Sequence, residues 1–293
     1  MQIIHSVMNI CEYQAKYRHE NEQHVEQVVY RDKQHEGECK KWYENGQLYV
    51  QSFYRDGKRE GEYKSWHANG QLCEQAFYQN GKLEGKRKLW HENGRIYAQE
   101  FYRNGKTEGE CKYWRANGRL CEQAFYRDGK LEGERKFWYE NGQIEDQTFY
   151  CDGILNGKSK EWSENGQRCA QAFYRSGNLE GERKIWHENG RIYVQEFYRN
   201  GELEGESKEW SENGQLIERS FYWDGKLEGE SKSWNENGGT ITSHFYHSNG
   251  DVIDRNFSTK KKCTILRMKR WLHFQSLIFS ISPYIISDLT SFI

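Results

Sequence analysis

The sequence predicts an all-β fold, an elongated single-layer antiparallel β-meander of about nine hairpin repeats of 24 residues each. Three observations predict it. Phenylalanine recurs every 24 residues from Phe53 to Phe245, and tryptophan recurs at the same step from Trp42 to Trp234. Asn-Gly and Asp-Gly dipeptides follow the same period, and both favour tight turns between paired strands. The segments between these dipeptides have strand length and are too short for typical helices.

A degenerate repeat is expected at the start of the chain, over residues 1–28. The stretch 17–23 aligns with 41–47, but Arg18 stands where the repeat has tryptophan, and Glu22 stands where it has the turn glycine. Terminal repeats often diverge because one of their faces meets water. We therefore expect this segment to cap the array and to protect its edge strand.

The regular array is expected over residues 29–257, with two strands in each repeat. One unit reads F-Y-x-[DN]-G-K-x-E-G-E-x-K-x-W-x-x-N-G-Q-L. We expect Asn69-Gly70 to form a type I′ turn, and Asp56-Gly57 to form the turn at the other end of the hairpin. Because an isolated hairpin is marginally stable in water, neighbouring units must pair with one another.

Three glycine series follow the 24-residue step and hold most of the 28 glycines. Two of them serve the turns. The third, represented by Gly61, opens a strand, and we interpret its missing side chain as room for a neighbouring aromatic ring. The positions expected to build the repeat in the central units are Trp66, Trp90, Trp114, Trp138, Phe77, Phe101, Phe125, Gly70, Gly94 and Gly118.

A basic run and then an apolar segment follow the array, over residues 258–293. The stretch 271–287 has 17 residues without a formal charge, which is short for a membrane span. We favour a helical cap over the open end of the sheet. A helix that docks on a membrane surface or on a partner is the alternative, and a spanning helix is the third. The residues at helical spacing on one face are Ile265, Met268, Leu272 and Phe279.

The composition argues against several classes of function. Lys and Arg (43) nearly balance Asp and Glu (44), so the net charge of −1 gives no general attraction to nucleic acid. The first residues lack the features of a secretory signal, so we expect an intracellular protein with reduced cysteines. The eight cysteines form no C-x-x-C pair, which argues against zinc. No set of residues indicates an enzyme or a cofactor.

Lysine occupies one position in all nine units, two residues before the tryptophan. Two interpretations stay open. The lysines pair with glutamate or aromatic rings on adjacent strands, which we favour, or they form a ladder that binds a ligand. The candidate interaction ladder comprises Lys64, Lys88, Lys112, Lys136 and Lys160. Three histidines flank the turns, and we interpret them as solvated side chains: His67, His91 and His187.

The unit Y-E-N-G-Q … F-Y-R-D-G-K-L-E-G-E resembles the MORN repeat in its variant form, over about residues 29–257. Similar arrays occur in bacterial proteins of the antitoxin-like type. The dense W-x-x-N-G-Q-L pattern is most similar to repeat families of giant DNA viruses of amoebae, of the marseillevirus type. The resemblance implies a curved or twisted single-layer sheet that is used for protein contacts, dimerisation or membrane-associated scaffolding.

The sequence therefore predicts a non-catalytic repeat scaffold that mediates protein–protein interaction with an unknown protein partner. The resemblance adds two alternatives. One is a peripheral membrane or phosphoinositide-associated adaptor that uses residues 258–293. The other is an antitoxin-like binder of one specific partner. For a viral chain, the resemblance implies the host cytoplasm as its location.

Overall fold

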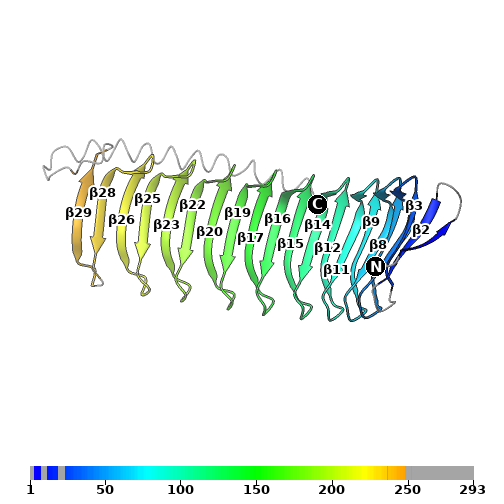
Figure 1. The fold of residues 1–293 in the computed structure, drawn as a ribbon. Helices are drawn as coiled ribbons and strands as arrows, with labels where there is room; N and C mark the ends of the chain where they lie inside the picture. Colours follow the sequence, from blue (N-terminus) through cyan, green and yellow to red (C-terminus); the bar gives the residue numbers. More distant parts are fainter. Residues whose placement is uncertain (1–2, 8–11, 19–23, 236, 248–251, 253–293) are drawn as a thin grey trace, which may run out of the picture. The chain divides into compact units, whose positions relative to one another are not determined.

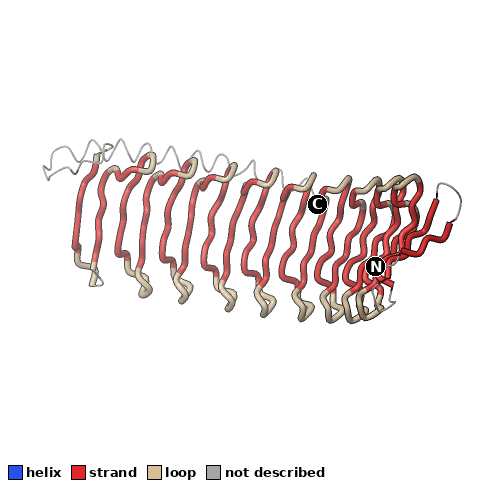
Figure 2. Tube along the Cα trace, in the orientation of Figure 1, coloured by secondary structure: helices blue, strands red, loops and turns tan. Residues whose placement is uncertain are grey.

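The computed structural model describes residues 3–7, 12–18, 24–235, 237–247 and 252. These residues form strands and turns, with no helix among them (Figure 2). The chain divides into two compact units, Met1–Ile154 and Leu155–Ile293. The helical cap expected over residues 258–293 lies outside the described residues.

In the first unit, the longer strands pair antiparallel in chain order, and each two-residue strand pairs with the long strand before it (Figure 1). The N-terminal strands are β1 (Ile3–Val7), β2 (Glu12–Arg18) and β3 (His24–Arg31). Strands that end at tryptophan are β5 (Gly37–Trp42), β8 (Gly61–Trp66), β11 (Gly85–Trp90), β14 (Gly109–Trp114) and β16 (Lys130–Trp138). Their eight-residue partners are β6 (Leu48–Arg55), β9 (Leu72–Gln79), β12 (Ile96–Arg103), β15 (Leu120–Arg127) and β17 (Ile144–Cys151). Two-residue strands are β4 (Gln34–His35), β7 (Lys58–Arg59), β10 (Lys82–Leu83) and β13 (Lys106–Thr107).

The second unit repeats this pattern, and β18 (Ile154–Leu155) spans the boundary between the units in sequence. Strands that end at tryptophan are β19 (Gly157–Trp162), β22 (Gly181–Trp186), β25 (Gly205–Trp210) and β28 (Gly229–Trp234). Their longer partners are β20 (Arg168–Arg175), β23 (Ile192–Arg199), β26 (Leu216–Trp223) and β29 (Thr240–Tyr246). Two-residue strands are β21 (Asn178–Leu179), β24 (Glu202–Leu203) and β27 (Lys226–Leu227). The prediction of an all-β antiparallel meander of hairpin repeats is confirmed.

Most repeats contain a two-residue strand in addition to the two strands predicted, whereas in β16 this segment is continuous with the longer strand. Arg59 pairs with Tyr54, and Lys64 pairs with Gln51. Between these two pairs, the four residues 60–63 on one strand lie opposite only the two residues 52–53 on the other. The extra residues form a β-bulge around Gly61. This bulge separates the short β7 from β8.

The glycine of this bulge is required by its backbone conformation. Gly61 has a φ of +87°, which side chains of L-residues rarely adopt. A Cβ atom added there would come no closer than 4.0 Å to Phe53 Cβ, and one added at Gly85 would meet no atom within 4 Å. The prediction that this glycine makes room for an aromatic ring is therefore wrong.

The two turns of each repeat differ in geometry. At Asp56-Gly57 both residues have positive φ, +49° and +72°, which is the type I′ geometry that suits a two-residue hairpin. At Asn69-Gly70 only the glycine has positive φ, +83°. The type I′ prediction is therefore wrong for the Asn-Gly turns.

The Asn-Gly turn is a three-residue loop with a glycine bulge. Gly70 N donates to His67 O (2.8 Å), and His67 N donates to Gln71 O (2.8 Å). This is the pattern of a type I turn followed by a residue in the left-handed region. Asn69 Oδ1 accepts a hydrogen bond from Gln71 N (3.0 Å), so the asparagine supports the loop through its side chain.

Several of these asparagine side chains also link a repeat to the next one. Asn69 Nδ2 donates to Glu92 O (2.7 Å). Asn45 makes the same bond to Ala68 O (3.0 Å), and Asn189 in the second unit makes it to Glu212 O (2.7 Å). The Asn-Gly motif therefore fixes the turn and the spacing of successive repeats together.

In several repeats the residue after the tryptophan forms a second link to the next repeat. His67 Nε2 lies 2.9 Å from Trp90 O, and His91 Nε2 lies 2.9 Å from Trp114 O. His187 Nε2 lies 2.7 Å from the carbonyl of Trp210 in the second unit. The prediction that these histidines are solvated is wrong, because the tryptophan carbonyl of the following repeat lies within their reach.

The glutamate that precedes the bulge glycine forms a third link. Glu60 Oε2 accepts from Asn80 N (2.7 Å), and Glu84 Oε2 accepts from Asn104 N (2.7 Å). In the second unit, Glu180 holds the amide of Asn200 in the same way (2.9 Å). Each of these glutamates therefore supports the type I′ turn of the repeat that follows it.

Candidate functional site

The sheet presents two faces of different chemistry, because successive residues of a strand point to opposite sides. Glu38 pairs with Phe53 and Lys40 with Gln51, so these four side chains share one face. We call this face, with its equivalents at 24-residue steps, the lysine face. The opposite face carries Cys39, Ser52 and Tyr54 with their equivalents, and we call it the tyrosine face.

A triad of polar side chains recurs on the lysine face. Lys64 Nζ lies 2.8 Å from Glu62 Oε2, and Gln75 Nε2 donates to Glu62 Oε1 (2.8 Å). The hydrogen bond from Lys64 and a second one from Gln75 lower the pKa of Glu62. The lysine therefore pairs with a glutamate two residues earlier on its own strand, and the cross-strand bond comes from glutamine.

The predicted lysine ladder divides into two groups. Lys112 lies 2.8 Å from Glu110, and Lys136 lies 2.6 Å from Glu134, as in the triad of Lys64. Lys88 and Lys160 follow a lysine instead, at positions 86 and 158, and have no ion pair among the described residues. That the ladder binds a ligand stays a prediction.

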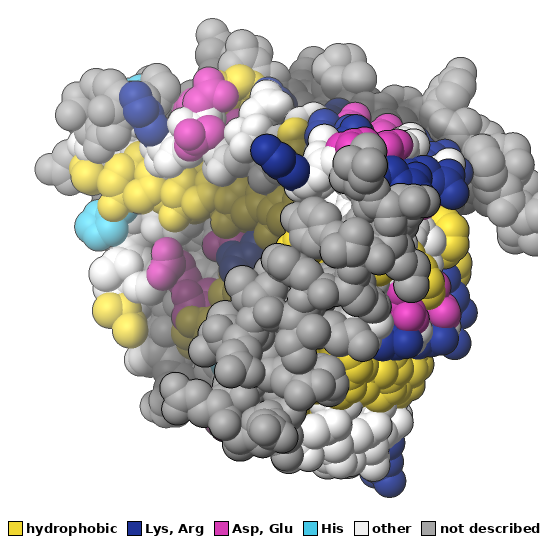
Figure 3. Space-filling view, turned by 45° about the vertical axis from the view of Figure 1, so that its right-hand side comes forward, with side chains coloured by type: hydrophobic (Ala, Val, Ile, Leu, Met, Phe, Trp, Pro, Cys, Tyr) yellow, Lys and Arg dark blue, Asp and Glu magenta, His cyan; other side chains and the backbone are white. Residues whose placement is uncertain are grey.

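Partly exposed aromatic rings lie on the lysine face beside these charges. Phe53 is 37% exposed and Phe77 is 47% exposed. Phe101 and Phe125, at the equivalent positions, are half-buried, and Lys86 Nζ lies 5.6 Å from the centre of the Phe101 ring. On the described surface, bands of neighbouring basic and acidic side chains run beside bands of hydrophobic ones (Figure 3).

The predicted structural positions fall at strand ends and turns. Each tryptophan is the last residue of its strand and lies next to a bulge. The four predicted tryptophans are partly buried: Trp66, Trp90, Trp114 and Trp138. Gly70, Gly94 and Gly118 all have positive φ in the Asn-Gly turns. These residues build the repeat, and their side chains form no catalytic arrangement.

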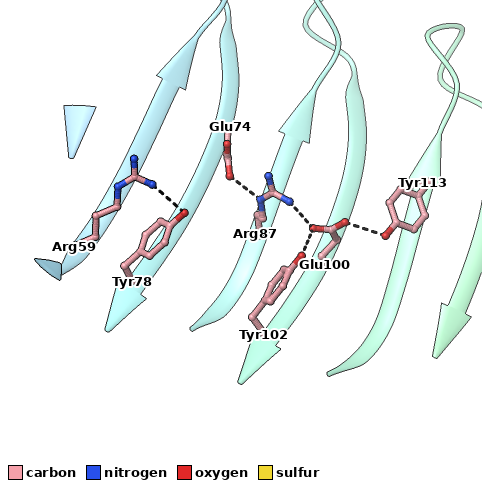
Figure 4. Close-up of polar contacts among 7 residues, drawn as sticks. All are labelled: Arg59, Glu74, Tyr78, Arg87, Glu100, Tyr102 and Tyr113. Atoms are coloured by element: carbon pink, nitrogen blue, oxygen red, sulfur yellow. Dashed lines mark hydrogen bonds and ion pairs between the residues drawn. The ribbon is translucent and has the colours of Figure 1, made fainter. Parts of the chain in front are cut away.

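The tyrosine face of the first unit holds a buried ionic cluster (Figure 4). Arg87 lies between two glutamates, 2.6 Å from Glu74 and 3.0 Å from Glu100. Glu100, which is 7% exposed, also accepts hydrogen bonds from Tyr102 (3.0 Å) and Tyr113 (2.9 Å). A buried carboxylate needs such partners to offset its desolvation. Burial and the Glu100 carboxylate raise the pKa of Tyr113.

The second unit holds a smaller cluster of the same kind. Arg183 Nη1 lies 2.8 Å from Glu196 Oε2, and the Tyr198 hydroxyl donates to the same oxygen (2.8 Å). Burial, together with the hydrogen bond to Glu196, raises the pKa of Tyr198 to about 12. In both clusters the polar atoms bond to one another within the sheet.

The repeat pattern of the sequence does not indicate these clusters. The position of Arg87 holds Cys39, Tyr63 and Cys111 in neighbouring repeats, so no 24-residue series reveals it. One signal is present all the same. Arg87 is separated by 13 residues from each of its two glutamates. Glu100 lies directly opposite it on β12, whereas Glu74 on β9 lies opposite Leu89 and so diagonally from Arg87.

The described residues offer no site for a metal ion, since no group of three or more His, Cys, Asp or Glu side chains among them is suitably arranged. Within the same part of the chain, no helix combines the length and the apolar character that crossing a membrane requires. The six cysteines described there are free thiols.

A family model described as the MORN repeat variant matches seven segments of the chain. These are residues 36–56, 59–80, 83–104, 131–152, 155–176, 179–200 and 203–224. Together they cover just over half of the chain. The model leaves out residues 105–130, where the structure has the same hairpin in β14 and β15.

No curated protein is significantly similar to the chain. Among solved structures, "Crystal Structure of TcdB2-TccC3" is 9% identical, with a TM-score of 0.16 over 82% of this chain and 17% of that chain. "Crystal Structure of TcdB2-TccC3-TEV" is 10% identical, with a TM-score of 0.17 and the same coverage. The chain thus spans 17% of the length of these structures' chains.

Proposed function

Because the chain belongs to the MORN repeat variant family, we propose that it is a non-catalytic scaffold that binds another protein through its lysine face. The family is defined by its repeat architecture. Function must therefore be argued from the surface that the repeats present.

The exposed phenylalanines carry this proposal. Aromatic rings are enriched at the centres of protein interfaces, where they supply apolar contact area with few rotatable bonds. Phe53 and Phe77 are 37% and 47% exposed, and they occupy successive repeats of one face. The neighbouring Glu62 already pairs with Lys64, so a partner that covers the rings need not neutralise an isolated carboxylate.

The tyrosine face is the weaker candidate. Its smallest side chains are buried completely, as at Ala98, Cys111 and Ala124, each 0% exposed. The long side chains above them, such as Arg87 and Glu100, already bind one another. A partner on this face would have to compete with bonds that the sheet already contains.

Two repeats indicate the chemistry of the partner. Lysine replaces the triad glutamate at Lys86 and Lys158, so each of these repeats carries two neighbouring positive charges. Acidic side chains on a partner would complement these positions, and complementary charge speeds association and fixes orientation. We therefore propose a partner with apolar side chains next to acidic ones.

Experiments on the first unit test this proposal. The full chain is used to capture partners from a lysate, and a captured protein is then bound directly to purified variants. The Phe53→Ala/Phe77→Ala double variant is expected to lose binding. Lys58→Ala/Lys82→Ala changes two exposed residues near the type I′ turns and is expected to keep it. Unchanged binding by the phenylalanine variant, with a thermal midpoint like that of the parent, contradicts the proposal.

A membrane adaptor and an antitoxin-like binder remain alternative proposals, which the structure of the repeat array does not favour. A membrane or phosphoinositide adaptor would use residues 258–293, which lie outside the described residues. Sedimentation with liposomes, with and without this segment, separates that function from protein binding. An antitoxin-like role, an origin in a giant virus of amoebae and a location inside the cell are supported by the sequence resemblance alone.

A further inference from the structure

Seven Asn-Gly turns of the array share one local sequence. Glu-Asn-Gly occurs at Asn45, Asn93, Asn141, Asn165, Asn189, Asn213 and Asn237. Asparagine is a chemically labile residue, and glycine after it leaves the backbone nitrogen sterically open. Since the three residues are the same at all seven sites, differences in their reactivity in the folded protein must come from more distant residues or from the structure.

The reaction is deamidation. The glycine backbone nitrogen loses its proton and attacks Cγ of the asparagine side chain. A new C–N bond closes a succinimide ring, and Nδ2 leaves as ammonia. Water then opens the ring at either carbonyl and leaves aspartate or isoaspartate. The step exchanges ammonia for water and needs no oxidant or cofactor.

Several turns inside the array hold the asparagine side chain at both ends. Asn93 Nδ2 donates to Ala116 O (2.8 Å), and its Oδ1 accepts from Arg95 N (3.1 Å). Asn189 is held in the same way, by Glu212 O (2.7 Å) and Arg191 N (3.0 Å). Both bonds must break before Cγ can turn toward the glycine nitrogen.

The last turn of the array lacks both of these bonds. Gly239 N, which occupies the position of Arg95, donates to Asn235 Oδ1 instead (2.8 Å). Asn237 N donates to the same oxygen (3.1 Å). No hydrogen bond joins the Asn237 side chain to any other described residue, and it is exposed. No further repeat is present among the described residues to receive its Nδ2.

We propose that Asn237-Gly238 is a site of spontaneous deamidation, and that the two side-chain hydrogen bonds protect the equivalent turns at Asn93 and Asn189. The product places a negative charge in the turn between β28 and β29. Isoaspartate would also lengthen the backbone of that turn. The modification thus changes the terminal hairpin and leaves the rest of the array as it is.

Peptide mapping of the full chain tests the proposal. The folded protein is incubated at 37 °C near neutral pH and digested with trypsin at intervals, and Asn and Asp forms are quantified by mass spectrometry. Residues 89–95 (LWHENGR) and 185–191 (IWHENGR) are matched internal controls, and 233–255 carries the proposed site. Fragment ions separate Asn237 from Asn249 in that peptide.

Asn237 is expected to deamidate about tenfold faster than Asn93 and Asn189, a ratio that corresponds to about 1.4 kcal/mol of barrier. Two side-chain hydrogen bonds supply a difference of this order. In guanidinium chloride the rates should converge. Equal rates in the folded protein, or an unchanged order of rates after unfolding, would overturn the proposal.

A variant tests the contact that leaves Asn237 unbound. Asn235→Ser installs the residue found before the Glu-Asn-Gly of Asn165 and Asn213, where Oδ1 accepts from the backbone N two residues on (3.0 Å in both). Deamidation at Asn237 should then slow toward the rate at those sites. An unchanged rate would show that Asn235 does not control the reaction, contrary to the proposal.

Discussion

Glu60 and Glu62 stand two residues apart in one motif, yet their carboxylates have different partners. Glu60 accepts from the backbone amide of Asn80 in the following turn (2.7 Å). Glu62 binds Lys64 (2.8 Å) and Gln75 (2.8 Å) on the lysine face. The intervening bulge produces this difference, because it places the two side chains in different parts of the repeat. Residue identity alone does not distinguish them.

The triads predict a pH-dependent part of the stability. Hydrogen bonds from Lys64 and Gln75 lower the pKa of Glu62. Burial raises the pKa of Glu38, but hydrogen bonds from Lys40 and Gln51 outweigh it, so that this pKa is lowered too. A lowered folded-state pKa stabilises the protein above the unfolded value of about 4.3, and this contribution is lost as the pH falls through the folded-state value.

The double variant Glu38→Gln/Glu62→Gln should therefore have a lower thermal midpoint at neutral pH. The difference should be roughly 1 kcal/mol or less, since both side chains are partly exposed. The midpoints of parent and variant should approach each other as the pH falls below about 4. Glu92→Gln is the control, because the Glu92 carboxylate takes no hydrogen bond among the described residues. A gap that persists unchanged in acid would contradict the assignment.

Restoring a missing triad should stabilise the second unit. Lys158 stands opposite Phe173, two residues before Lys160, which pairs with Gln171. In Lys158→Glu, the new carboxylate would lie within reach of both polar partners. We expect a gain of about 0.2–1 kcal/mol in the free energy of unfolding, measured in urea at low salt.

Lys158→Gln is the matched control for removing a charge without adding one. It should gain less than Lys158→Glu, and the difference between the two should shrink in high salt. Equal stability of the two variants at low salt would show that the triad adds nothing beyond removing the repulsion between the lysines.

At the scale of the element, each hairpin depends on one glycine with positive φ at its Asn-Gly turn. Gly118 has a φ of +88°. A Cβ added there would lie 3.6 Å from Arg95 Cδ, so space is sufficient and the backbone conformation is the constraint. This conformation costs an ordinary L-residue about 1–2 kcal/mol.

Gly118→Val is therefore expected to destabilise the array by at least about 1–2 kcal/mol, since a β-branched residue resists positive φ. Gly118→Asn should cost less, because asparagine tolerates the left-handed region. Thermal unfolding of both variants measures the effect. A valine variant with the midpoint of the parent would mean that the turn does not hold Gly118 in this conformation in solution.

The hairpins could be predicted from sequence because turn and strand positions recur in every copy. The dipeptide Asn69-Gly70 predicts a turn at this position but does not predict the type of that turn. The type depends on the number of residues in the loop, which the dipeptide does not reveal. The bonds of His67 and Glu60 to the next repeat also depend on the stagger of adjacent hairpins. The Arg87 cluster could not be predicted because its position varies from repeat to repeat.

At the scale of the whole molecule, the open question is what covers the last strand. Ile241 in β29 is 64% exposed in the structure, and an unpaired edge strand invites further pairing. Beyond β29, Val252 forms an isolated antiparallel bridge with Tyr246. Residues 258–293 are the candidate cap that follows.

Deleting residues 258–293 should therefore increase self-association if that segment caps the array. Light scattering on the truncated and full chains measures the change. The membrane interpretation predicts the opposite, namely better solubility and loss of liposome binding. A truncated protein that stays monomeric and becomes more soluble would contradict the cap.

The three links between repeats have one further consequence, which concerns the gene. Asn69 reaches 23 residues ahead and Glu60 reaches 20, so every such bond joins a repeat only to its immediate neighbour. An exchange between copies of the stretch WHENGRIY, which begins at 90 with Trp and again at 186, would remove four whole repeats. The shortened chain would find an equivalent partner for each side chain at the junction. Alleles that differ in length by whole repeats can therefore arise while the same hydrogen bonds form between neighbouring repeats. An insertion of any other length breaks all three links at once.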